Sequence, residues 1–183
     1  MMRILDIVLS AAGLIVTSPL LILLSFVGWR DTGSPIFRQE RVGRHQRPFV
    51  LYKFRTMRLE TPQVATHLVA AASVTTFGGF LRRTKLDELP QLWNVLWGEM
   101  SLVGPRPCLF NQTELIRARE ARGIFDVRPG ITGLAQVNGV DMSDPTRLAT
   151  LDAEMLRQLT VLAYLRYILW TATGRGAGDQ VRG

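Results

Sequence analysis

The chain has 183 residues, of which 47% are hydrophobic and 20% charged, and this composition fits one domain of ordinary size. It excludes a disordered tail and a bundle of many membrane helices. The single cysteine, Cys108, excludes a disulfide framework within the chain and leaves too few thiols for a structural zinc site.

The charge is strongly basic. Twenty arginines and two lysines stand against 15 acidic residues, which gives a net charge of +7. Such an excess fits an anionic partner, which can be nucleic acid, a lipid headgroup surface or a phosphorylated substrate. Arginine binds phosphate with two parallel N–H groups, whereas lysine acts as a point charge. Composition alone does not choose among the three partners.

The N-terminal segment predicts a membrane helix. Ile7 to Val27 is a run of 21 residues without a charge, and a helix that spans a bilayer needs about 20 apolar residues. A cleaved signal peptide and a buried helix of a soluble core are the alternatives. The length of the run and the lack of an Ala-x-Ala cleavage site after it disfavour both.

Proline interrupts this run near its centre. Pro19 follows Thr17 and Ser18, and it frees the backbone carbonyl of Ile15, which a neighbouring hydroxyl can bind. Each arm then has ~11–14 residues, or about 16–21 Å of helix, too short to cross a bilayer alone. Two topologies therefore compete: a kinked spanning helix, and a bent hairpin that enters and leaves by the same membrane face.

The flanks of the apolar run carry charges on both sides. Arg3 precedes it and Arg30 follows it, so the positive-inside rule favours both ends on the cytoplasmic face. Asp6, close to Arg3, is tolerated at an interface and costly at the centre of a bilayer.

Beyond the membrane segment, turn residues and hydrophobic periodicity predict the remaining elements. They are, in chain order, strands at 35–39 and 49–55 joined by a hairpin loop at 43–48, a weak Ala/Thr-rich loop or soft helix at 61–76, helices at 77–83 and 109–122, a turn at 128–133, a short strand at 134–138, a helix at 145–170 and a flexible tail at 173–183.

Two adjacent acids are expected at the start of another helix. Thr84 and Asp87 have the spacing of a capping box, and Leu89, Leu92 and Leu96 follow at helical intervals. This places Asp87 and Glu88 at a helix N-terminus, where the dipole keeps a carboxylate ionised, as a nucleophile or a Mg²⁺ ligand must be. Neighbours on a helix point about 100° apart, so the two acids should have separate roles. An ordinary helix cap is the alternative.

Basic residues surround these acids in the sequence. Lys53 and Arg55 share one face of a predicted strand, and Arg82 lies shortly before the acidic pair. Arg106 lies between two prolines, which stiffen the backbone, and Arg128 precedes another proline. Together with the two carboxylates they indicate a phosphate site with a divalent metal.

Other chemistries find no support. The sequence has no phosphate-binding P-loop, no Gly-x-Gly-x-x-Gly and no Gly-x-Ser-x-Gly motif. His45 and His67 are too few for a zinc site. Trp93 and Trp97, four residues apart, predict a stripe in the core or at a membrane interface. No recognition-helix pattern supports nucleic-acid binding.

Four motifs resemble the bacterial sugar transferases known as small monotopic phosphoglycosyl transferases, and Ser18-Pro19 in the apolar segment matches the family as well. The motifs follow the family's order and cover nearly the whole chain. They are Tyr-Lys-Phe-Arg-Thr-Met (52–57), Arg-Arg-Thr-Lys-Leu-Asp-Glu-Leu-Pro-Gln-Leu-Trp-Asn-Val-Leu (82–96), Met-Ser-Leu-Val-Gly-Pro-Arg-Pro (100–107) and Val-Arg-Pro-Gly-Ile-Thr-Gly-Leu-Ala-Gln-Val-Asn-Gly (127–139).

This resemblance implies an activity. Such enzymes move a phosphosugar from a UDP-sugar to a polyprenyl (undecaprenyl) phosphate and release UMP, the first membrane step in assembly of O-antigen, capsule, exopolysaccharide or glycoprotein. Asp87 matches the nucleophile that forms a covalent phosphosugar intermediate, and Glu88 the residue that assists it and helps to hold Mg²⁺. Lys53, Arg55 and Arg82 match basic positions that bind phosphates or the nucleotide, and so does Arg106.

The resemblance also implies an α/β fold that is mainly α. Residues 1–30 would form a re-entrant membrane helix, broken at Ser18-Pro19, and residues 31–172 a small cytosolic catalytic domain with amphipathic interface helices and a short β-hairpin. Residues 173–183 would be a flexible tail. The expected location is the cytoplasmic face of the bacterial inner membrane, in the minimal, monotopic form of the family.

Two regions depart from the family pattern. Residues 58–74 are Ala/Thr-rich where relatives carry an acidic segment, and the stretch from Leu151-Asp152 lacks the usual aromatics. The family's contacts with the sugar and the lipid are therefore not carried over to that stretch. A non-enzymatic membrane-surface scaffold, which binds anionic lipid through the arginine excess, is the alternative function.

Overall fold

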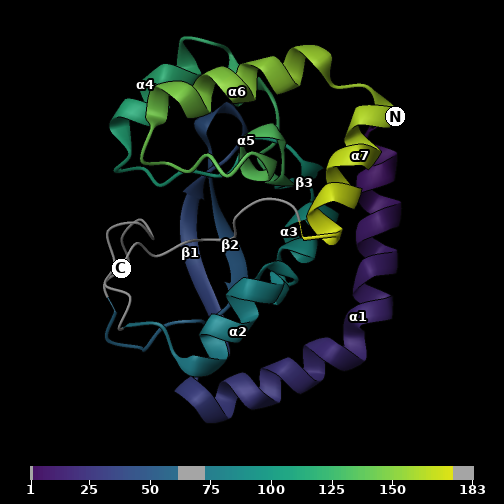
Figure 1. Ribbon diagram of the computed structural model, residues 1–183, viewed down its shortest axis with the longest axis vertical. Coiled ribbons are helices and arrows are strands. Elements are labelled where there is room, and N and C mark those ends of the chain that lie inside the picture. The colour runs from purple at the N-terminus through teal and green to yellow at the C-terminus, as the bar shows by residue number, and fades with distance from the viewer. Residues whose placement is uncertain (1, 62–72, 175–183) are drawn as a thin grey trace.

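The computed structural model describes residues 2–61 and 73–174. Within them the protein is mainly helical, with two small sheets of two strands each (Figure 1), as expected for a mainly α fold. The Ala/Thr-rich stretch and the C-terminal tail lie mostly outside the described residues. The elements are α1 (Met2–Thr32), β1 (Ile36–Val42), η1 (Arg44–Gln46), β2 (Pro48–Phe54), α2 (Thr76–Thr84), η4 (Leu86–Glu88), α3 (Gln91–Trp97), β3 (Ser101–Val103), α4 (Thr113–Glu120), η5 (Ile124–Asp126), β4 (Gly130–Thr132), α5 (Leu134–Val137), α6 (Pro145–Gln158) and α7 (Val161–Ala172).

The apolar helix α1 bends near its middle (Figure 1), and Pro19 lies inside it. The Ser18 hydroxyl donates to the carbonyl oxygen of Ile15 at 2.8 Å, the acceptor that Pro19 leaves without its helical partner. The Thr17 hydroxyl donates to the Gly13 carbonyl at 2.7 Å. The prediction that a local hydroxyl satisfies the freed carbonyl is confirmed, so the helix continues through the bend.

Few residues of α1 are buried. Large apolar side chains such as Ile15, Val16 and Ile22 are more than 70% exposed. The buried positions of this 31-residue helix are Asp6, Ser10, Leu14, Leu24 and Gly28. The helix is long and apolar enough to cross a membrane. This exposure excludes the alternative of a buried core helix.

The N-terminal end of α1 is bound to the body of the protein by a buried carboxylate. Asp6, 3% exposed, accepts hydrogen bonds from the Ser101 hydroxyl at 2.9 Å, the Leu102 backbone N–H at 2.8 Å and the Tyr164 hydroxyl at 2.5 Å. Arg3 donates to carbonyl oxygens at the end of α3. The first arm of α1 is therefore fixed to β3, α3 and α7.

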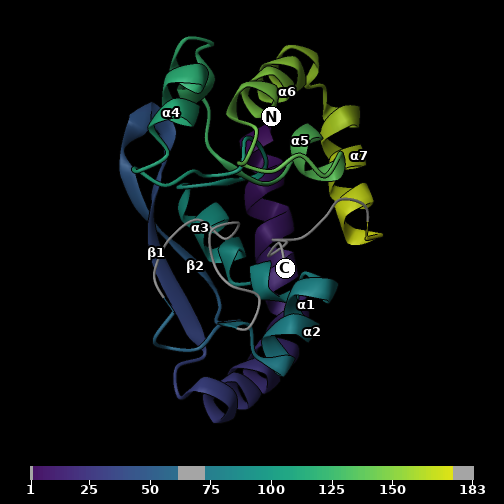
Figure 2. The ribbon, with the colours of Figure 1, turned by 60° about the vertical axis from the view of Figure 1, so that its left-hand side comes forward.

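The predicted β-hairpin is confirmed. Strands β1 and β2 pair in antiparallel register, with Phe37 opposite Lys53. The loop between them contains the short η1 turn, and His45 and Gln46 there have the left-handed φ values of 55° and 57°. Figure 2 shows the hairpin and α7 on opposite sides of the body.

The region after residue 128 differs from the prediction. The expected turn contains β4, which pairs in parallel with β3, and the expected strand at 134–138 is the helix α5. The reason is a backbone contact that glycine alone permits, because a Cβ on Gly130 would lie 2.0 Å from the backbone nitrogen of Gly104. The two backbone segments meet at these glycines. The strand therefore forms at Gly130–Thr132, before the predicted position, and a helix follows from Leu134.

Two predicted helices also have different bounds. The helix expected at 145–170 is broken into α6 and α7, because Thr160 caps a new helix by accepting the Ala163 N–H at 3.2 Å. The helix expected at 109–122 begins only at Thr113, since the Gln112 side chain binds the Leu109 N–H and holds a turn there.

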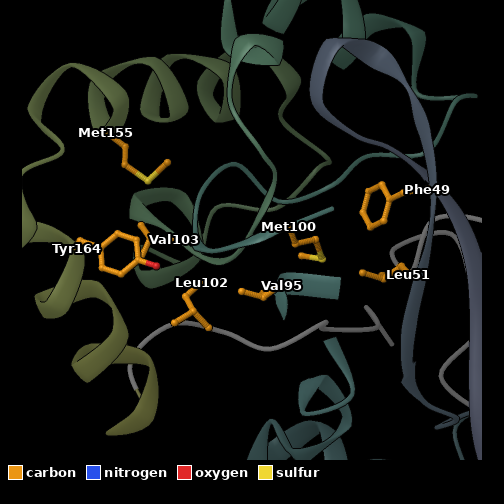
Figure 3. Close-up of a cluster of buried hydrophobic side chains, with 8 residues drawn as sticks. All are labelled: Phe49, Leu51, Val95, Met100, Leu102, Val103, Met155 and Tyr164. Carbon is orange, nitrogen blue, oxygen red and sulfur yellow. The ribbon is translucent and has the colours of Figure 1, made fainter. Parts of the chain in front are cut away.

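The largest core cluster lies where α3, β2 and β3 meet α6 and α7. Figure 3 shows side chains from these five elements, and α1 covers the cluster with partly buried apolar residues near its N-terminus. Its buried members are Phe49, Leu51, Val95, Met100, Leu102, Val103, Met155 and Tyr164. The core thus joins the first arm of α1 to the elements that precede and follow the acidic pair.

Candidate active site

The acidic pair lies on a short 3₁₀ turn between two helices. The predicted capping box is wrong: Thr84 is the last residue of α2, and its hydroxyl donates back to the Phe80 carbonyl at 2.9 Å. Lys85 then adopts a left-handed conformation with φ of 58°, and η4 follows. Since α3 begins only at Gln91, the two acids lie on the turn before this helix and not in its first turn.

The two carboxylates have different environments, as expected of neighbours. Asp87 is buried, with 3% of its surface exposed. Glu88 is partly buried, and its Oε1 accepts a hydrogen bond from Nη2 of Arg106 at 2.9 Å. One acid is thus enclosed and the other is neutralised by a guanidinium. This arrangement suits one reacting group and one group that holds a neighbour in place.

Lys85 belongs to the same cluster of charges. Burial lowers the pKa of its ammonium group; Glu88 opposes this effect and Arg106 adds to it. The left-handed turn at Lys85 therefore brings a third charged side chain within electrostatic range of the Glu88–Arg106 pair.

A narrow recess connects this cluster with the hairpin. Lys53 and Arg106 both line it, so the structure brings together two of the predicted phosphate ligands. Sequence reasoning missed two other polar residues in its wall, Arg41 and Gln91, which are 7% and 4% exposed. The alternation of Gln39 and Arg41 on a strand that pairs with the Lys53 strand was an available signal, because residues two apart share a face.

The remaining predicted basic residues lie around the recess or away from it. The Arg55 guanidinium carbon and the Lys53 ammonium nitrogen both lie over the Phe37 ring, 5.5 and 5.6 Å from its centroid. Arg82 donates from Nε to the Thr56 hydroxyl at 2.8 Å. Arg128 is not in the recess wall, and its Nε donates to the Gly98 carbonyl at the end of α3. A phosphate-binding role for Arg128 stays a prediction.

A second, apolar groove of about 400 Å³ opens on the other face of the hairpin. The Trp93 and Trp97 rings in its wall are 5.7 Å apart and 45% and 63% exposed, which favours an interface stripe over a core stripe. Arg38 lies over the Tyr52 ring beside the groove. The groove is lined by Leu21, Ser25, Ile36, Arg38, Tyr52, Phe54, Pro90, Trp93 and Trp97.

The oxygen donors at the acidic pair are those that Mg²⁺ uses. Magnesium is commonly held by one or two carboxylates together with substrate phosphates. Among residues 2–61 and 73–174 no group of three or more histidine, cysteine or acidic side chains has the arrangement of a metal site. Asp87 and Glu88 thus fit an ion that a diphosphate helps to coordinate, and they do not form a site made of protein ligands alone.

Comparison with known proteins gives consistent results. The sequence is 45% identical over 149 residues to a UDP-galactose-lipid carrier transferase of Erwinia amylovora, covering 71% of this chain and 31% of the relative. It is 41% identical over 154 residues to an undecaprenyl-phosphate galactose phosphotransferase of Salmonella typhimurium, covering 75% and 32%. A UDP-glucose:undecaprenyl-phosphate glucose-1-phosphate transferase of Caulobacter vibrioides is 40% identical over 171 residues, covering 91% and 61%.

The chain spans about a third of the length of the first two of these relatives. A family model described as bacterial sugar transferase matches residues 1–175. Because this match covers nearly the whole sequence, the chain belongs to the bacterial sugar transferase family.

Proposed function

We propose that the protein transfers a sugar phosphate from a UDP-sugar to a polyprenyl phosphate and releases UMP. The observation that carries this proposal is the buried Asp87 next to Glu88, whose ion-pair partner Arg106 lines a recess together with Lys53. The named relatives act on UDP-galactose, UDP-glucose or undecaprenyl phosphate, so UDP-glucose and UDP-galactose are the first substrates to test.

The chemistry follows from an enclosed carboxylate. Asp87 attacks the phosphorus that carries the sugar, the P–O bond to UMP breaks, and UMP leaves with the bonding electrons. An oxygen of the polyprenyl phosphate then attacks the same phosphorus and displaces the Asp87 carboxylate. Lys53 and Arg106 neutralise the phosphate oxygens in both steps, and Glu88 keeps the Arg106 guanidinium in place.

Mg²⁺ is the cofactor of this proposal. Asp87 and Glu88 would hold it together with the diphosphate. The bound ion supplies positive charge that stabilises the leaving UMP.

The acceptor lipid requires a site at the membrane, and α1 provides the anchor. Its N-terminal end is bound to the catalytic body through Asp6, and its exposed apolar surface continues past the bend at Pro19. We propose that the helix enters and leaves the bacterial inner membrane by the cytoplasmic face. Exposed leucines of α7 add a second apolar surface: Leu162, Leu165 and Leu169.

This topology is tested by asking from which side of the membrane single introduced cysteines can be labelled. Cys108 is buried and is the one cysteine of the sequence, so Met2→Cys and Thr32→Cys can each be labelled with a membrane-impermeant reagent against a low background. Equal labelling from the cytoplasmic side of inverted vesicles is expected. Labelling from opposite sides would replace the re-entrant helix with a spanning one.

The activity is tested with the UDP-sugar alone, in the absence of any lipid acceptor. The purified protein should release one equivalent of UMP and gain the mass of a sugar phosphate on the peptide that contains Asp87. Asp87→Asn should abolish both signals, whereas Asp126→Asn, at an exposed carboxylate, should retain them. Normal turnover by the Asp87→Asn protein would refute the covalent route. A folded protein without UMP release from any UDP-sugar, but with salt-sensitive binding to anionic liposomes, would favour the scaffold function.

A further inference from the structure

The segment that carries Arg106 is bound along its whole length. Four successive backbone carbonyls, those of residues 105–108, each accept a hydrogen bond: one from β4, one from α4 and two from β1. These bonds are Gly130 N–H to Pro105 O (2.9 Å), Arg119 Nη1 to Arg106 O (2.7 Å), Arg41 Nη1 to Pro107 O (3.1 Å) and Val42 N–H to Cys108 O (2.9 Å). A loop held in this way presents its side chains in one orientation.

The bond to Arg106 comes from a fully buried ion pair. Arg119 of α4 and Asp152 of α6 have side chains that are 2% and 0% exposed. Nε and Nη2 of Arg119 donate to Oδ2 of Asp152 at 3.0 and 2.7 Å, and Nη1 remains for the Arg106 carbonyl. One guanidinium thus links two helices to the backbone of the candidate phosphate ligand.

The electrostatics show that this pair is costly to bury. Burial raises the pKa of the Asp152 carboxyl, and Arg119 opposes that shift. The second carboxylate oxygen, Oδ1, is buried and has no hydrogen-bond partner in the part of the chain that the structure describes. Because desolvation offsets much of the attraction within a buried ion pair, such a pair contributes little net stability. The more specific property of this ion pair is the hydrogen bond from Arg119 to the Arg106 carbonyl.

We propose that Arg119 and Asp152 are positioning residues for the Arg106 guanidinium. Asp152 orients Arg119, Arg119 binds the Arg106 carbonyl, and the Arg106 side chain is thereby directed at Glu88 and the recess beside Lys53. This inference rests on the proposed function, in which Arg106 binds phosphate, and gives a role to two residues outside the recess.

The activity test uses two variants of the full-length protein. Asp152→Asn keeps the shape of the side chain and removes its charge. Arg119→Lys keeps the charge but has a single nitrogen, which cannot bind the Asp152 carboxylate and the Arg106 carbonyl in the same geometry. Each should lower kcat/KM for UMP release by about tenfold or more, since small displacements of a positioning group cost up to about 100-fold. Leu148→Ala, in the core on α6, is the control that loses stability and keeps kcat/KM.

A double-mutant cycle separates positioning from general damage. In the Arg106→Ala background, Asp152→Asn should cause less than about a twofold further loss, because residues that act through one another are not additive. The same fold-loss in both backgrounds would overturn the proposal, and so would wild-type kcat/KM in both single variants.

Cys108 provides a measurement that does not depend on any activity. Its thiol is fully buried within the bound segment, beside Arg119, and burial raises its pKa. It should therefore react with a thiol reagent only when the segment opens. Asp152→Asn and Arg119→Lys should accelerate labelling more than Tyr164→Phe, a change in a different core cluster, when each is compared at the same interval below its melting temperature. Equal labelling rates would refute the positioning role, whereas faster labelling without any UMP release from the wild-type protein would refute the proposed function alone.

Discussion

Replacing Tyr164 by phenylalanine tests how firmly α1 is bound to the body of the protein. The Tyr164 hydroxyl donates to the buried Asp6 carboxylate at 2.5 Å, and Asp6 retains the Ser101 and Leu102 donors in the variant. A hydrogen bond to a charged group contributes about 1.5–3 kcal/mol. For a chain of this size, 1 kcal/mol corresponds to about 2–4 °C in Tm. Tyr164→Phe should therefore lower Tm by about 3–12 °C.

The same bond predicts a pH dependence. Burial, together with the hydrogen bond to Asp6 and its negative charge, raises the pKa of Tyr164 far above its ordinary value of 10.0. The protonated hydroxyl is the form that the folded state favours, so its contribution to stability is complete below pH 10 and is lost as the pH rises above 10. The slope reaches about 1.4 kcal/mol per pH unit for one proton.

The measurement is thermal unfolding in detergent micelles between pH 8 and pH 11. Above pH 10 the Tm of the wild-type protein should fall more steeply than that of Tyr164→Phe. Tyr167→Phe, three residues further along α7, is the comparison: burial raises the pKa of Tyr167 as well, but Asp6 accepts its hydrogen bond from the Tyr164 hydroxyl, so Tyr164→Phe should flatten the pH curve more. Parallel pH curves for the wild-type and Tyr164→Phe proteins would refute the assignment of a buried charged acceptor at Asp6.

Two further predictions concern the support of the recess. Gly78→Ala places a Cβ 2.1 Å from the Thr56 backbone oxygen and should lower the free energy of unfolding by about 3 kcal/mol. Gly79→Ala, with its nearest contact at 3.6 Å, should raise the free energy of unfolding by about 0.5–1 kcal/mol. Thermal melting compares these neighbours on α2. Arg106→Ala, which removes the partner of Glu88, should lower kcat/KM for UMP release by about 100-fold, and a loss below threefold would contradict a phosphate-binding role.

Local signals account for the elements that could be predicted. The hairpin strands follow from turn residues and β-branched or aromatic content, and the satisfied break in α1 follows from Ser18 beside Pro19. The pairing of β3 with β4 could not be predicted in this way. Each strand has three residues, and the contact that aligns them depends on Gly104 and Gly130, which are 26 positions apart in the sequence.

The candidate site shows the same division between local and distant information. Motifs predicted Asp87, Glu88 and Arg106 as site residues, but the capping box assigned the wrong local structure to the two acids. A pattern of spacing does not reveal that Lys85 turns the chain into a left-handed conformation before them. The surroundings of the acids depend on that turn, because it ends α2 and begins η4.

The arginine excess illustrates why charge counting is incomplete. The sequence suggested anionic partners for these residues, yet several arginines bind backbone carbonyls of this chain. Arg3 binds the end of α3, Arg41 and Arg119 bind the segment around Arg106, and Arg128 binds Gly98. The partners of Arg3, Arg41 and Arg119 are 92, 66 and 13 residues away in the sequence. Part of the net charge therefore serves internal structure, which leaves less of it for the lipid scaffold function.

The hairpin separates two environments that the proposed reaction needs. Residues alternate across β2, so Tyr52 faces the apolar groove and Lys53 faces the polar recess. The groove is bounded by α1 beyond its bend, through Leu21 and Ser25, whereas the recess is bounded by the loop that Arg119 holds. A lipid anchored along α1 and a diphosphate bound beside Arg106 would thus approach the protein from different faces of the same two strands. In the proposed reaction, the bend at Pro19 and the fixed loop would each position one substrate relative to Asp87.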